Sequence, residues 1–150
     1  MIFYYLDASA WVKRYYTEAG TSWVQDLFAR NEVIACASLG LIEVMATLSR
    51  KRKAREITAA QFKLKARELE DDWAFFIQVQ LNAEVLNNAS ALTKNFALRG
   101  ADAVHLSSAL ILQKHFQDKK DRLIIVTSDH ELRQSAEASG VEVIDPAKEA

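Results

Sequence analysis

Two short apolar segments that each end near an acidic residue constrain the fold of this chain most strongly. The segment IFYYL at residues 2–6 runs directly into Asp7, and LIIV at 123–126 is followed, after two hydroxyl residues, by Asp129. Runs this short and this apolar are typical of strands that are buried on both faces. Such strands occur in parallel sheets covered by helices on both sides. The two segments therefore predict an α/β fold.

The rest of the sequence alternates between further apolar segments and segments of helical length. Additional strands are predicted at 33–36, 75–79 and 141–144, and helices at about 8–16, 22–30, 39–54, 58–74, 83–97, 101–116 and 129–138. Ser22, Ser38 and Thr58 are expected to cap the helices near them. Gly100 is expected to break the chain and Gly140 to close the last helix. The alternation predicts a mostly parallel sheet of four to five strands, flanked by helices on both faces.

Length and composition narrow the class of protein further. The chain has 150 residues, half of them apolar, so we expect a single domain over residues 1–150 with one well-filled core. Four glycines and one proline are too few for a sandwich of many short strands. The formal net charge of -1 predicts that any nucleic-acid binding depends on a local patch.

The sequence also favours a cytoplasmic location. Cys36 is the only cysteine, so no intramolecular disulfide can form, which suits a reducing compartment. The first ten residues lack the basic region of a signal peptide and reach Asp7 early. No apolar stretch approaches the roughly 20 residues needed to cross a bilayer. We therefore expect a cytoplasmic protein without a membrane partner.

Asp7 and Asp129 occupy positions at which α/β proteins commonly bind ligands. Each follows a predicted strand, and open parallel sheets bind ligands beyond the carboxyl ends of their strands. An aspartate at the start of a helix also satisfies unpaired backbone N–H groups. Sequence position alone therefore leaves both interpretations open, a ligand-binding acid or a helix cap.

Glu43 is predicted to lie on the apolar face of its helix, beside the stripe formed by Leu39, Ile42, Ala46 and Ser49. A charged glutamate on such a face costs several kcal/mol unless it is paired or coordinated. Glu43 is therefore a metal ligand, one half of a buried salt bridge, or a residue at the edge of the stripe that reaches water.

Asp102 opens a predicted helix and projects from the same face as Leu106, Ala109 and Leu110. The helix dipole favours an acid in the first turn. That effect explains the position of Asp102 but not the apolar face that follows it, so a role in a site stays open beside the structural one.

Carboxylates that converge in one cleft repel each other, so they require shared protons or bound cations. Mg²⁺ and Mn²⁺ prefer oxygen ligands and bind with few protein groups and several waters. A zinc site is not predicted, because there is one cysteine and the three histidines lack partners at metal-binding spacing. The acids therefore predict a magnesium or manganese site.

Four segments of the sequence form a distinctive pattern. They are YLDASAWVKRYY at 5–16, SLGLIEVMATLSR at 38–50, GADAVHLSSAL at 100–110 and IIVTSDHELRQSAEASGVEVIDP at 124–146. The last two are the most specific, with a D-A-x-H-L helix start followed by an apolar strand ending in T-S-D. The pattern resembles PIN-domain proteins, and more narrowly VapC-type toxin ribonucleases, over almost the whole chain. The resemblance implies a PIN-like fold.

The resemblance also implies a function and a set of site residues. It implies a toxin endoribonuclease that hydrolyses RNA phosphodiester bonds with Mg²⁺ or Mn²⁺ and is inhibited by a VapB-like antitoxin. A homodimer is implied in the same way. The implied metal-binding and catalytic residues are Asp7, Glu43, Asp102 and Asp129, and the supporting residues are Ser9, Thr127 and Ser128.

Three other features have two interpretations each. His105 either packs among helices with its nitrogens hydrogen-bonded or contacts the cleft. The basic run RKRKAR at 50–55 is either a solvated helix end or a patch for RNA phosphates. The aromatic residues of the first two helices form either core or a groove for an antitoxin.

Other functions remain compatible with the sequence. A PIN-domain nuclease could serve housekeeping RNA processing or cleave DNA. The same fold could be a non-catalytic binding module whose acids are only caps. A hydrolase of small phosphate esters is disfavoured, because the first strand ends in DASA rather than in a pair of acids suited to a phospho-aspartate route.

Overall fold

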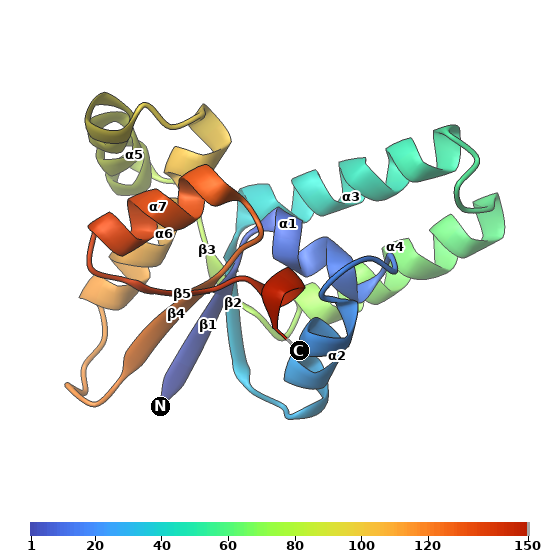
Figure 1. Cartoon of the computed structure of the whole chain (residues 1–150), viewed down its shortest axis with the longest axis horizontal. Coiled ribbons are helices and arrows are strands. Elements are labelled where there is room, and N and C mark those ends of the chain that lie inside the picture. Colours follow the sequence, from blue (N-terminus) through green and yellow to red (C-terminus); the bar gives the residue numbers. More distant parts are fainter. Residues whose placement is uncertain (150) are drawn as a thin grey trace.

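The computed structural model describes residues 1–149 and is built around one parallel sheet (Figure 1). Its strands are β1 (Ile2–Leu6), β2 (Val33–Ala37), β3 (Ile77–Val79), β4 (Arg122–Val126) and β5 (Glu142–Ile144). They are hydrogen-bonded in the order β3-β2-β1-β4-β5, and every neighbouring pair is parallel. The predicted fold class is confirmed.

The chain builds outward from β1 in both directions. It first adds β2 and β3 on one side of β1 and later adds β4 and β5 on the other. The strand order therefore reverses between β1 and β4, and ligands of open α/β sheets bind at the carboxyl edge of such a switch point. The residues that follow β1 and β4 are thus brought to one place.

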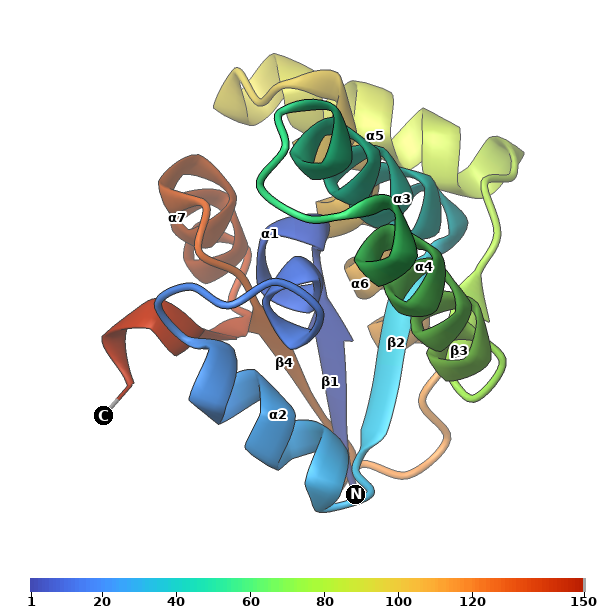
Figure 2. The same cartoon turned by 90° about the vertical axis from the view of Figure 1, so that its right-hand side faces the viewer.

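Helices cover both faces of the sheet, as Figure 2 shows. One face packs against α1 (Ala8–Trp11), α2 (Thr21–Ala29), α3 (Ser38–Lys53) and α4 (Ala59–Trp73). The other packs against α5 (Ala83–Phe96), α6 (Gly100–Lys114) and α7 (His130–Ala138). Two short 3₁₀ helices are η1 (Val12–Arg14) and η2 (Pro146–Lys148). None of the helices in residues 1–149 is both long and apolar enough to cross a membrane.

Side chains of β1 alternate between the two cores, as the pleat of a strand requires. Tyr4 and Leu6 lie in the core under α1–α4, whereas Tyr5 lies in the core under α5–α7. Trp11 and Tyr15 are buried in the first of these cores. The expectation that most aromatic residues of the first two helices serve the core is confirmed for this pair.

Two of the predicted helix boundaries are confirmed by their hydrogen bonds. Thr58 and Gln61 form a complete capping box at the start of α4. Gly140 follows α7 with a φ of 82°, a conformation that favours glycine. These two signals depend only on neighbours in sequence, which is why the sequence alone revealed them.

Three other predicted boundaries are wrong. Helix α2 begins after Gly20 rather than with a side-chain cap at Ser22. Ala37 precedes α3, and the hydroxyl of Ser38 instead donates to the carbonyl of Val79 in the neighbouring strand. Gly100 is the first residue of α6, because the chain turns earlier, at Ala97, where φ is 53°. In the second case a tertiary contact replaced the local cap.

The predicted apolar stripe of α3 is also wrong. Its buried face is formed by Gly40, Val44 and Leu48, while Ile42 is 65% exposed and Ser49 is exposed. Gly40 sets this rotation, because a Cβ there would lie 2.3 Å from the sulfur of Cys36 and 3.3 Å from Cε1 of His105. The helix therefore approaches β2 closely on its glycine side.

We predict that Gly40→Ala destabilises the protein by about 1–3 kcal/mol through overpacking. Thermal or urea unfolding measures the effect. Gly100→Ala is the matched control, because a Cβ at that helical glycine meets nothing within 4 Å and stability should be unchanged or slightly raised. In a Cys36→Ala background the cost of Gly40→Ala should fall, and an undiminished cost would show that the sulfur contact is not its cause.

Candidate active site

Asp7 is buried at the carboxyl end of β1, where it is 3% exposed. Its Oδ1 accepts hydrogen bonds from the hydroxyl of Ser9 at 2.7 Å and from the backbone N–H of Ala10 at 3.0 Å. Its Oδ2 accepts one from the hydroxyl of Thr127 at 2.7 Å. Asp7 is thus the N-terminal cap of α1 and also a fixed carboxylate at the switch point of the sheet.

The hydroxyls that contact Asp7 also bind the loop after β4. Ser9 Oγ accepts the N–H of Ser128 at 3.0 Å, and Thr127 Oγ1 accepts the N–H of Asp129 at 3.0 Å. The structure therefore brings Ser9 and Thr127 against Asp7. The side chain of Ser128 donates instead to Asp145 at 2.7 Å, so this residue faces the site only through its backbone.

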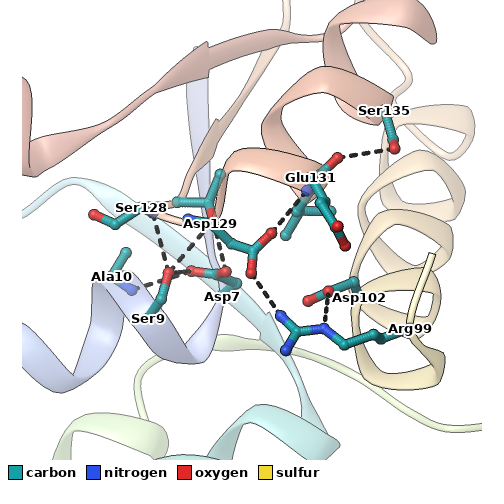
Figure 3. Close-up of polar contacts among 11 residues, drawn as sticks. Asp7, Ser9, Ala10, Arg99, Asp102, Ser128, Asp129, Glu131 and Ser135 are labelled. Atoms are coloured by element: carbon teal, nitrogen blue, oxygen red, sulfur yellow. Dashed lines mark hydrogen bonds and ion pairs between the residues drawn. The ribbon is translucent and has the colours of Figure 1, made fainter.

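The guanidinium of Arg99 bridges Asp129 and Asp102, a contact that the sequence did not predict. Asp129 caps α7 through Oδ1, which accepts the N–H of Leu132 at 2.9 Å. Its Oδ2 lies 2.7 Å from Nη2 of Arg99, and Nε of Arg99 lies 3.2 Å from Oδ2 of Asp102 (Figure 3). The sequence signal for this contact was the spacing of three residues between Arg99 and Asp102, which suits an ion pair at a helix start.

Glu43 pairs with His105, so the salt-bridge interpretation describes this structure. Oε1 of Glu43 lies 2.5 Å from Nε2 of His105, and Nδ1 lies 2.8 Å from the hydroxyl of Tyr5. That hydroxyl also accepts the N–H of Ala37 at 3.1 Å. His105 is 2% exposed with both nitrogens engaged, which confirms the expectation that it packs among helices. Tyr5 was not singled out from the sequence.

Burial sets the protonation of this region. Burial raises the pKa of Asp7, although His105 and the hydroxyls of Thr127 and Ser9 oppose the shift. Burial also raises the pKa of Asp102, and the negative charges of Asp129 and Asp7 raise it further. Burial opposes a charge on His105, but its contacts with Tyr5, Cys36 and Glu43 raise its pKa well above the usual value. The charges of Asp7 and Asp129 thus disfavour the ionised form of Asp102.

The donor set suits a hard divalent cation more than any other group. All the acids offer oxygen ligands, and the guanidinium of Arg99 already occupies a cationic position between Asp102 and Asp129. In residues 1–149 no three acidic, histidine or cysteine side chains are arranged to hold one ion as they stand. Metal binding would therefore require Arg99 to leave the carboxylates.

A groove of about 510 Å³ opens beside these residues. One wall comes from α1 and η1, the other from α3, and Ser9, Glu43 and Ser128 line the end next to the acids. A substrate lying in this groove would meet the site from the side of α3.

We predict that Asp102→Asn raises the Tm in EDTA at pH 7–8 by a few degrees, since about 1 kcal/mol corresponds to roughly 2–4 °C in a chain of this size. The pKa of Asp102 is raised in the folded state, so stability is lost as the pH rises from 3.8 through that raised pKa. The gain should therefore vanish below pH 3.8. A lower Tm at neutral pH would instead make Asp102 a structural partner of Arg99.

The comparisons with known proteins agree with this fold. The sequence profile of the PIN domain matches residues 4–138. Two proteins of Mycobacterium tuberculosis, ribonuclease VapC45 and ribonuclease VapC49, are each 35% identical over 139 residues, which cover 93% of this chain and 92% of each relative.

Solved structures share the architecture at lower identity. VapBC2 of Rickettsia felis, bound to a DNA fragment from its promoter, matches with a TM-score of 0.65 and 17% identity over 96% of this chain and 98% of that chain. PAE2754 of Pyrobaculum aerophilum matches with a TM-score of 0.65 and 19% identity over 95% and 83%. The profile and the two close relatives decide the assignment: this chain belongs to the PIN domain family and is of the VapC type.

Proposed function

We propose that the protein is a toxin endoribonuclease that hydrolyses RNA phosphodiester bonds with Mg²⁺ or Mn²⁺. One observation supports the proposal most: Asp7 and Asp129 follow the two central strands at the switch point of the sheet, and Arg99 bridges Asp129 to Asp102 beside them (Figure 3). Two relatives at 35% identity are named ribonucleases, which supports RNA as the substrate.

Each acid has a distinct role in this proposal. Asp7 is the rigid ligand, because three hydrogen bonds fix its two oxygens before any ion arrives. Asp102 would help to hold the first ion once Arg99 has moved away, and Glu43 would do so through Oε2, because His105 contacts only Oε1. Asp129 is assigned to a second ion or to orienting the attacking water. The bound ion supplies charge neutralisation, phosphate binding and a lowered pKa of water.

The proposal includes two protein partners, a VapB-like antitoxin and a second copy of this chain. Solved structures of the same fold include the toxin–antitoxin complex of Klebsiella pneumoniae. The protein also carries an apolar residue suited to an interface, since Phe75 is 91% exposed beside a small pocket lined by Arg14 and Phe28. A cytoplasmic location follows from the RNA substrate.

The test is cleavage of a panel of structured RNAs by the wild-type protein with Mn²⁺, by the same protein with EDTA, and by Asp7→Asn with Mn²⁺. We expect cleavage only in the first case, with a loss of about two orders of magnitude or more for the variant. Asp26→Asn is the matched control, because Asp26 is an exposed acid of α2 that pairs with Arg30 and stands outside the proposed ligand set.

Equal cleavage under all three conditions would refute the metal–carboxylate mechanism. Absence of both RNA cleavage and Mn²⁺ binding would favour a non-catalytic binding module. Cleavage of DNA but not of RNA would make the protein a DNA nuclease.

We predict that Arg99→Ala binds Mn²⁺ several-fold more tightly than the wild type, because the guanidinium no longer competes for Asp102 and Asp129. Calorimetric titration of the apoprotein measures this without reference to activity. Arg133→Ala removes the same charge from the neighbouring helix α7, where Arg133 pairs with Glu137, and should change the affinity little. Unchanged or weaker binding by Arg99→Ala would show that the arginine does not compete with the ion.

A further inference from the structure

The groove beside the acids continues along α3, away from the sheet. We call it the α1–α3 groove, and it runs from Ser9 and Glu43 to Arg50, with Lys13 on the opposite wall. The exposed side chain of Ile42 also lines the groove and gives it an apolar contact surface. Its volume of about 510 Å³ lies in the range of pockets that hold ligands the size of a nucleotide or two.

Arg50 is aligned with Glu43 on one face of α3. Residues at positions i, i+4 and i+7 of a helix share a face, and Glu43, Thr47 and Arg50 have this spacing. Nη2 of Arg50 donates to the hydroxyl of Thr47 at 3.0 Å, and that hydroxyl donates to the carbonyl of Glu43 at 2.9 Å. Seven residues of helix separate Arg50 from Glu43 by about 10 Å. The backbone of Arg50 therefore lies about 10 Å along α3 from that of Glu43, and its guanidinium reaches back toward Thr47.

The next two cations after Arg50 contact other side chains of the protein. Lys51 pairs with Glu56 at 3.1 Å and lies 4.3 Å from the ring centre of Tyr16. Arg52 lies 4.9 Å from the ring centre of Phe62. Arg50 differs from these two because it lines the α1–α3 groove, and no carboxylate of residues 1–149 lies within ion-pair distance of its guanidinium.

Lys13 provides a second cation on the facing wall. The residue is 5% exposed, and its ammonium donates to Glu18 at 3.0 Å. An ammonium carries three donors, so one bond to Glu18 leaves capacity for an anion in the groove.

We propose that the α1–α3 groove holds the RNA strand that flanks the scissile phosphate, with Arg50 and Lys13 binding its backbone phosphates. The inference rests on the proposed function and adds a direction to it: the strand leaves the acids along α3 toward the arm of α3 and α4 in Figure 1. Phosphate contacts position a strand without reading its sequence, so the groove binds RNA of any sequence.

The test uses the full chain carrying Asp7→Asn, so that cleavage does not interfere, with Mg²⁺ present. Binding of a fluorescent twelve-nucleotide oligouridylate is followed by anisotropy across a series of salt concentrations. Adding Arg50→Ala should weaken binding roughly tenfold at low salt, as expected for one lost charge-assisted contact. It should also make the slope of log K against log salt shallower by about 0.7, the value for one phosphate of a single strand. Arg50→Lys should restore most of the slope.

The matched control is Arg122→Ala, because Arg122 begins β4 at the opposite edge of the sheet and pairs there with Glu142. The RNA affinity and the salt slope of the Arg122→Ala protein should equal those of the Asp7→Asn parent. Equal binding by the Arg50→Ala and parent proteins would overturn the groove assignment while leaving the proposed function intact, provided that the wild type cleaves RNA. A polyglutamate peptide of equal charge that binds with the same dependence on Arg50 would also overturn it, in favour of an acidic protein partner.

Discussion

The buried carboxylate of Asp7 is the constraint on which the rest of the site depends. Its two oxygens accept hydrogen bonds from α1 on one side and from the end of β4 on the other. Those same hydroxyls hold the backbone of the loop that carries Asp129. One carboxylate therefore fixes the relative positions of the two central strands and of two acids. The energetic cost of its burial is met by these hydrogen bonds rather than by a salt bridge.

The surrounding acids are balanced by groups of the protein itself. Arg99 neutralises Asp102 and Asp129 from the solvent side, and His105 holds Glu43 from the core side. The two cations differ in freedom, since the side chain of Arg99 is 71% exposed whereas that of His105 is 2% exposed. Arg99 can move away without disturbing the core, but His105 cannot. The open side of the site is therefore the side that can exchange its counter-ion.

The sequence predicted the features that depend on short-range patterns. The buried strands were found because parallel strands read as unbroken apolar runs, and the positions of Asp7 and Asp129 followed from the ends of β1 and β4. The rotation of α3 was missed because it depends on the contact of Gly40 with Cys36 and His105, which no periodicity contains. Arg99 and Tyr5 were missed for a related reason. A charged residue at a helix start and an aromatic residue in a strand both have ordinary explanations until the fold brings their partners close.

The hydrogen bond between Thr127 and Asp7 has a consequence for synthesis of the protein. Its partners are 120 residues apart in a chain of 150, and β1 pairs with β4 over a similar separation. Contacts this distant in sequence form late, because the intervening loop must first be closed. A nascent chain on the ribosome thus holds Asp7 without one of the partners that order it until Thr127 has emerged. A chain that stops before Thr127 therefore cannot assemble the site that β1 and β4 form together.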